Sequence, residues 1–438
     1  MKTENTNKKL EEILHNINNN NFENALALFN NSSIIKNDIK LSYKLLATIY
    51  FKKGDWQKSI DYYEKRLPLE EKKYQILNNI GVALFKLGKI HRSIKTYKES
   101  INENNKFDLT YENLGIAYKE IGIYDKAINV FVDALKLNKN NINVKENLLS
   151  IFNIVKPKNA NMHPLIECNS KIRNLSKNIL IDKIISTKEI KKILYKSENI
   201  ISSYNQNFNC RETQILRKNS TNLNCERHFK IFNKFKVIPK FCFNCYKIQI
   251  ELINVVDLIR LYFLFDNISL KKNNIRKCII ETRANIKANY KGYVYCDGLN
   301  ESKDVLNTIN SHIPILGIKN HKVFIKHGCS EYAEIHPKYK KINFDGPQEM
   351  KFDDEWLKKE KIIDDQIFTR NEEDETKFSE TLKGINLYDI FIIKNWLNYA
   401  KIIGDNSYKE IFEKKLNDKF LSGLLKNQLD FRKKELLN

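Results

Sequence analysis

The chain has 438 residues, with 75 Lys and Arg against 53 Asp and Glu, which gives a formal net charge of +22. A hydrophobic share of 42% is enough for packed cores and excludes a wholly disordered chain. At roughly 150 residues per domain, the length predicts two to four domains. No apolar run reaches the ~18 residues of a membrane span, and residues 1–9 lack the apolar segment of a secretory signal. We therefore expect a cytoplasmic protein without membrane association.

The positive charge comes almost entirely from lysine. Only 11 of the 75 basic residues are Arg, and the remaining 64 are Lys. Interfaces that read phosphates and bases favour Arg because its guanidinium forms two parallel hydrogen bonds. The composition therefore favours a generally basic, solvated surface over a nucleic-acid interface, which we keep as an alternative.

A period of 34 residues runs through the N-terminal third of the chain. Its members are two series of small residues and one series of aromatic residues: Gly54, Gly88 and Gly122; Ala47, Gly81 and Gly115; Tyr63, Tyr97 and Phe131. A fixed period of this length indicates stacked repeats, each a pair of amphipathic helices. The first glycine series marks the end of the first helix in a left-handed turn, and the second series lets the paired helix approach closely.

This pattern resembles the tetratricopeptide repeat over residues 6–155. The register predicts a degenerate repeat at 6–39, with Asn20 at the glycine position. Full repeats follow at 40–73, 74–107 and 108–141, and a closing helix at 142–153. The proline typical of the family is replaced by Glu71, Asn105 and Lys139.

The resemblance implies a right-handed superhelix whose concave face binds a peptide or a partner helix. On that face we expect polar residues from the first helix of each pair: Lys44, Lys52, Asn78, Lys86, Asn113 and Lys119. The full Lys/Asn set with which some family members bind a peptide's terminal carboxylate is not reproduced. An alternative for each residue is an ordinary solvated surface.

The region from 206 to 345 has the pattern of an α+β domain. After a linker and helices at 156–205, strands are expected at Tyr246–Leu252, Cys278–Arg283, Gly292–Cys296 and Lys322–His327. Helices are expected at Asn254–Phe265 and from Asn300, a good N-cap residue. This βαββαβ order resembles the ferredoxin-like fold.

Seven of the eight cysteines fall between 210 and 329. In the ferredoxin-like topology, five of them and a histidine gather along one sheet edge: Cys242, Cys245, Cys278, Cys296, Cys329 and His327. The C-x2-C spacing of Cys242 and Cys245 lets two thiolates reach one ion. We expect Cys242, Cys245 and Cys329 to bind zinc rather than an iron–sulfur cluster, with Cys296 or Cys225 as the fourth ligand. The alternative is that these cysteines are buried thiols.

Two further functions remain open. The strand order is also that of RNA-recognition motifs, and Tyr293 and Tyr295 lie where that family stacks bases, although the rest of its signature is absent. No phosphate loop, nucleophile elbow or paired-histidine helix supports an enzyme. Catalysis on a substrate recruited by the repeats is the other alternative.

The last region, 346–438, is expected to be helical. Glu372–Glu375 reads as an acidic loop, Leu387–Ile403 as an apolar helix and Tyr408–Lys434 as an amphipathic one. The sequence thus predicts helical repeats, then an α+β domain, then helices. Its predicted function is a protein-interaction scaffold that docks a protein or peptide through the repeat groove, with no certain cofactor and no assigned catalytic residue.

Overall fold

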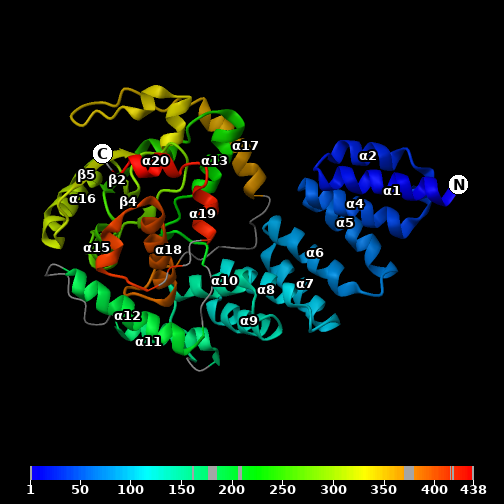
Figure 1. Cartoon of the computed structure of the whole chain (residues 1–438). Helices are drawn as coiled ribbons and strands as arrows, with labels where there is room; N and C mark the ends of the chain where they lie inside the picture. The colour runs from blue at the N-terminus through cyan, green and yellow to red at the C-terminus, as the bar shows by residue number, and fades with distance from the viewer. Residues whose placement is uncertain are drawn as a thin grey trace. The chain divides into compact units, whose positions relative to one another are not determined.

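The computed structural model describes residues 2–159, 162–175, 185–205, 210–368, 379–414, 416 and 419–436. These residues form two compact units (Figure 1). The first, which we call the repeat unit, contains residues 2–145 and 366–368. The second, the sheet unit, contains the other described residues from Glu146 onward. The regions 156–205 and 206–345, which the sequence separates, both fall in the sheet unit, and so do the described residues of 346–438 other than 366–368.

The repeat unit is helical throughout its described length. Its helices are α1 (Lys2–Asn18), α2 (Phe22–Asn30), α3 (Ser33–Asn37), α4 (Ile39–Lys53), α5 (Trp56–Arg66), α6 (Lys73–Lys86), α7 (Ile90–Glu103), α8 (Asp108–Glu120) and α9 (Tyr124–Leu137). Helix α10 (Ile142–Phe152) crosses the boundary at Lys145. In Figure 1 consecutive helices run side by side as hairpins from α4 to α9.

Each hairpin closes where a small residue on the first helix meets an aromatic ring on the second. A Cβ atom at Gly81 would collide with the ring of Tyr97, and one at Gly115 with the ring of Phe131. The Ser93 hydroxyl also donates to the Gly81 carbonyl over 2.8 Å. The first helix of the α4–α5 pair ends at Gly54, whose φ of 81° is the left-handed conformation that the period predicts.

The N-terminal pair α1–α2 shares features of these hairpins. Asn20, between the helices, has a φ of 60°, in agreement with its place at the glycine position of the register. Ala25 and Phe29 of α2 are buried, as Ala127 and Phe131 are in α9. The assignment of residues 6–39 as a degenerate repeat stays a prediction that these features support.

The sheet unit contains a five-stranded antiparallel sheet. Its strands are β1 (Gln214–Arg217), β2 (Cys245–Leu252), β3 (Arg276–Ile280), β4 (Tyr290–Asp297) and β5 (His321–His327). They are ordered β1-β3-β4-β2-β5. The sequence indicated the last four strands, whereas it gave no sign of β1, which pairs antiparallel with β3 at the edge.

One face of the sheet is covered by helices α15 (Val255–Asn267) and α16 (Leu299–His312). Gly292 of β4 lies under α15, where a Cβ atom would collide with Leu261. Because side chains alternate along a strand, the neighbours of Gly292 on β4, Lys291 and Tyr293, point to the opposite face. Helix α18 (Leu387–Ile403) packs on α15 and is buried along most of its length.

The remaining elements of the sheet unit are short segments around this core. They are α11 (Pro164–Leu175), α12 (Thr187–Ser203), α13 (Cys225–Phe235), α14 (Lys240–Asn244), α17 (Trp356–Phe368), α19 (Lys419–Leu425) and α20 (Leu429–Lys434), with 3₁₀ turns that include Ser330–Glu334 and Pro337–Lys340.

Two expectations about these segments differ from the structure, and a third concerns residues that it does not describe. Helix α16 begins after Gly298, not at an Asn300 cap. The segment Tyr408–Lys434, expected as one amphipathic helix, holds α19 and α20, which are separate. The acidic run Glu372–Glu375 lies outside the described residues. None of the helices in the described part of the chain is long and apolar enough to cross a membrane.

Candidate functional site

The first helices of the repeats carry the six residues predicted to bind a partner. Lys44, Lys52 and Lys86 are exposed, and Asn113 and Lys119 are half-buried. Lys52 donates to the side chain of Asn18 over 3.2 Å. Neither Lys44 nor Lys86 forms an ion pair with another described residue, so α4 and α6 each present a positive charge on an exposed face.

Asn78 differs from the other five because it is only 2% exposed. Its Oδ1 accepts hydrogen bonds from Asn113 Nδ2 over 2.9 Å and from Thr110 Oγ1 over 3.3 Å. The expectation that Asn78 is available to a partner is therefore wrong. The amide instead joins α6 to α8, because a buried amide must satisfy its hydrogen bonds within the protein.

Four cysteines gather at one end of the sheet and the turn that follows it. Cys242 lies in α14, Cys245 begins β2, Cys329 follows β5, and Cys225 begins α13. The sulfur of Cys245 lies against Gly328, beside Cys329. The Cys242 thiol lies 3.6 Å from the hydroxyl of Tyr332, which also forms a hydrogen bond with Cys329.

These four thiols are near enough to influence one another's ionisation. Burial, together with the neighbouring Cys329 and Cys225, raises the pKa of Cys245 to about 12. Burial likewise raises the pKa of Cys329 to about 11, again with a contribution from Cys225. The thiols are therefore neutral at pH 7 and would have to lose protons to bind a metal ion.

Cys278 lies apart from this cluster, whereas Cys296 is near enough to Cys245 to contribute to its raised pKa. Cys296 forms a hydrogen bond with Ser302 of α16, and Cys278 is buried beside Arg217. Within the described ranges, no group of three or more His, Cys, Asp and Glu side chains is arranged to hold a metal ion. The zinc site stays a prediction, and the structure favours Cys225 over Cys296 as its fourth thiol.

His327, expected beside the cysteines, has a different environment. Its ring stacks between Tyr246 and Tyr339, at centroid distances of 4.7 and 4.1 Å. Burial lowers the pKa of His327 to about 4, so the ring is neutral and packs as an aromatic residue.

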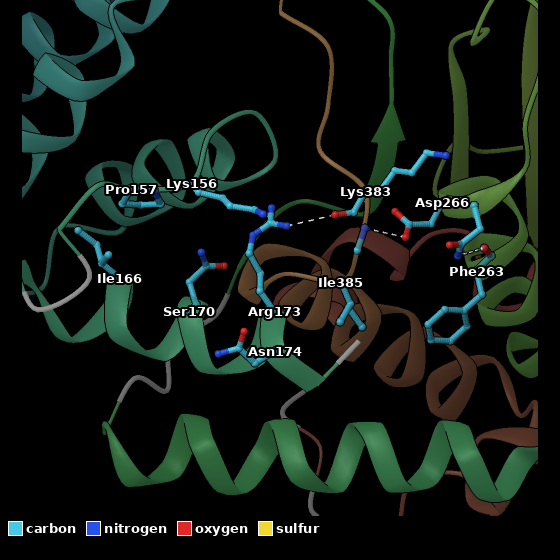
Figure 2. A pocket seen from close by; sticks show the side chains of 13 residues that line it. Lys156, Pro157, Ile166, Ser170, Arg173, Asn174, Phe263, Asp266, Lys383 and Ile385 are labelled. Carbon is cyan, nitrogen blue, oxygen red and sulfur yellow. Dashed lines mark hydrogen bonds between the residues drawn. The ribbon is translucent and has the colours of Figure 1, made fainter. Parts of the chain in front are cut away.

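A cavity of about 370 Å³ lies beside α11, α15 and the segment before α18. Figure 2 shows Arg173 pointing to the carbonyl of Lys383, to which it donates over 3.3 Å. Asp266 accepts from the Gly384 amide over 2.8 Å and from buried Arg217 over 2.7 Å. Arg173 and Asp266 thus bind groups of the protein itself.

The open face of the sheet carries charged residues that the sequence analysis did not single out. Lys277 of β3 and Lys326 of β5 face a hollow beside Lys247 of β2. The sequence shows at least one lysine in each of these strands. Recognising their grouping required the strand register, which places Lys247 directly opposite Lys326.

Comparison with known proteins identifies the repeats. Models of the tetratricopeptide repeat match residues 42–73, 74–107 and 110–141. No curated protein sequence matches the chain significantly. The matches to solved structures span most of the solved chain but only a minor part of this chain.

Three such structures show the extent of the likeness. The first TPR of Spaghetti (RPAP3), bound to the HSP90 peptide SRMEEVD, is 23% identical and covers 26% of this chain and 89% of its own, with a TM-score of 0.25. The Arabidopsis OM64 TPR domain is 19% identical over 25% and 91%, with a TM-score of 0.24. Pseudomonas aeruginosa pilF is 15% identical over 46% and 88%, with a TM-score of 0.31.

Proposed function

We propose that the three tetratricopeptide repeats at residues 42–141 dock an acidic segment of a protein partner on the exposed faces of α4 and α6. The observation that carries this proposal is the pair of exposed lysines, Lys44 and Lys86, on the first helices of two family-matched repeats; neither is ion-paired within the described part of the chain. Lys52, also exposed on α4, is the third positive charge of this surface.

Repeat arrays suit this role because each repeat contacts mainly its neighbours and the stack presents an extended surface. Complementary charge across such a surface speeds association and selects partners more than it increases affinity. The partner segment should therefore be rich in Asp and Glu, and its binding should weaken as salt rises.

Charge reversal in the full chain tests the proposal. The double variant Lys44→Glu, Lys86→Glu should lose the proteins that the immobilised parent retains from a cell extract. The matched control is Lys95→Glu, Lys106→Glu, which changes two exposed lysines away from the first helices and should retain them. Equal retention by both variants, or equal loss, would contradict the proposal.

We also propose that Cys225, Cys242, Cys245 and Cys329 bind one zinc ion. The mutual influence of their thiols on one another's pKa supports this set. Zinc in structural sites takes four thiolate or imidazole ligands, and these four come from segments far apart in the sequence, so binding would be coupled to folding.

Elemental analysis of the purified full chain should find about one zinc per molecule. Cys225→Ser and Cys245→Ser should each lower the zinc content and the melting temperature. Cys296→Ser is the matched control and should keep the metal. A parent protein that purifies without metal would contradict the site, and loss of zinc only from Cys296→Ser would contradict the choice of Cys225.

The strand order supports a third proposal, that the sheet unit is a ferredoxin-like fold extended by β1. The four predicted strands lie in the order β3-β4-β2-β5, and all pairs are antiparallel. Two helices, α15 and α16, pack on one face. An experimental structure in which β2 does not lie between β4 and β5 would contradict it.

A further inference from the structure

The open face of the sheet is hollowed by two adjoining cavities of about 410 and 920 Å³. They share Lys247, Arg283, Tyr293 and Glu331, so they form one continuous depression, which we call the sheet groove. Both volumes lie in or near the range typical of small-molecule sites, ~300–1,000 Å³. The groove lies on the face opposite α15 and α16.

The lining of the sheet groove is strongly cationic. Seven Lys and Arg side chains and four Glu side chains border the two cavities. The buried Glu281 is already bound, because it accepts from Lys291 Nζ over 2.8 Å and from Arg283 over 2.8 Å. Glu251 accepts from the side chain of Gln249 over 2.5 Å.

Among the described residues, three lysines of the groove form no ion pair with a carboxylate, although Glu331 lies near enough to favour their charged forms. Lys247, which is 8% exposed, donates to the carbonyl of Gly328 over 2.6 Å, and Lys277 lies 3.4 Å from the amide oxygen of Gln214. The third is Lys326. Desolvation lowers the pKa of both Lys277 and Lys326, which is the sign of ammonium groups held in a poorly hydrated place.

The strand register brings these charges together. Lys247 and Lys326 are direct cross-strand partners, and like charges in that position repel one another. Lys247 and Lys277 both lie against the ring of Tyr293, with Nζ atoms 5.1 and 5.3 Å from its centroid. Lys277 comes from β3, which β4 separates from β2, so it meets Lys247 across the ring of Tyr293, whereas Lys326 meets Lys247 from the other side. An anion bound between Lys247 and Lys277 would offset the repulsion around Lys247 and stabilise the sheet.

We propose that the sheet groove binds a small phosphate monoester, whose dianion lies between Lys247 and Lys277, which line the same cavity, with Lys326 adding positive charge beside Lys247. A dianion matches the excess of unpaired ammonium groups better than a single carboxylate does. A strand of RNA fits less well, because base stacking needs exposed rings and Tyr293, the ring at the centre of the groove, is only 4% exposed.

Calorimetric titration of the full chain tests this proposal with three probes: inorganic phosphate, adenosine 5′-monophosphate and a single-stranded oligouridylate of ten nucleotides. Adenosine 5′-monophosphate should bind and should raise the melting temperature as its concentration rises. Inorganic phosphate should compete for the same site. Tighter binding of the oligonucleotide than of the monophosphate would overturn the proposal in favour of RNA.

Variants then place the ligand in the groove. Lys247→Gln and Lys277→Gln keep a hydrogen-bond donor and should each weaken binding about tenfold, in keeping with the loss of one charge-assisted hydrogen bond. Lys188→Gln removes an exposed lysine from α12, outside the groove, and should bind as the parent does. Melting of each variant without ligand verifies folding. No binding of any phosphate probe, or equal weakening by Lys188→Gln, would overturn the proposal.

Discussion

Each unit of the molecule is stabilised by its own internal interactions, and these differ in how far apart the partners lie in the sequence. In the repeat unit the key contacts join residues 12 to 35 positions apart, such as Ser93 with the Gly81 carbonyl and Asn113 with Asn78. In the sheet unit Arg217 joins Asp266, 49 positions away, and Asp389, 172 positions away. Local contacts make the stability of the repeats a sum over neighbours, whereas the sheet unit depends on a few buried polar networks.

The largest expected loss of stability comes from replacing Arg217, which forms buried ion pairs with Asp266 and Asp389. Arg217 donates to Asp266 over 2.7 Å and to Asp389 over 2.8 Å, with all three side chains nearly or fully buried. Arg217→Met leaves two carboxylates buried without their cation and should lower the free energy of unfolding of the sheet unit by about 3–5 kcal/mol. Chemical denaturation followed separately in each unit measures this.

The control for that variant is Arg211→Met. Arg211 pairs with Glu146 at 2.6 Å, but its side chain is half-exposed, so the loss should be at most about 1 kcal/mol. Equal losses in Arg217→Met and Arg211→Met would show that the buried network does not hold the sheet unit together.

A smaller effect should appear when the pH is lowered. Burial lowers the pKa of His228 on α13 to about 4, whereas the unfolded chain takes up this proton near its ordinary pKa of 6.5. Stability contributed by the neutral ring is therefore lost between pH 6.5 and 4, by up to about 3 kcal/mol. His228→Phe keeps a ring against Phe241 and should give a shallower decline of unfolding free energy over that pH range. Parallel pH profiles for the parent and His228→Phe would contradict the assignment.

The smallest effect is expected within a single repeat. Gly81→Ala places a methyl group against the ring of Tyr97, and such overpacking should cost about 1–3 kcal/mol in the repeat unit alone. Gly423→Ala is the matched control, because a Cβ atom there meets nothing within 4 Å. Thermal melting that shows equal changes in the two variants would contradict the close approach of α6 and α7.

The same difference in sequence separation explains which parts of the fold could be predicted from the sequence. The repeats could be recognised because their contacts recur every 34 residues, and α18 because the segment Leu387–Ile403 is rich in apolar residues, most of which are buried. Strand β1 was missed because it has four residues, and it pairs, within the described residues, with β3 alone, some 60 positions away.

The candidate sites were harder to predict for a similar reason. Asn78 looked like a surface residue, but its exposure depends on Thr110 and Asn113 in the next repeat. Cys225 could be preferred to Cys296 as the fourth zinc ligand only because the structure places α13 near the other thiols. The lysines of the sheet groove required the pairing of β2 with β5.

The central claim is that a partner docks on the first helices of the repeats, and site-specific crosslinking tests it most directly. A photoreactive amino acid replaces Val82, which lies on α6 between Asn78 and Lys86, in the full chain within cells. We predict an adduct with one protein, joined through a segment rich in Asp and Glu, and none from the same probe at Lys95 on α7. The same adducts from both positions, or an adduct through a basic segment, would contradict the account.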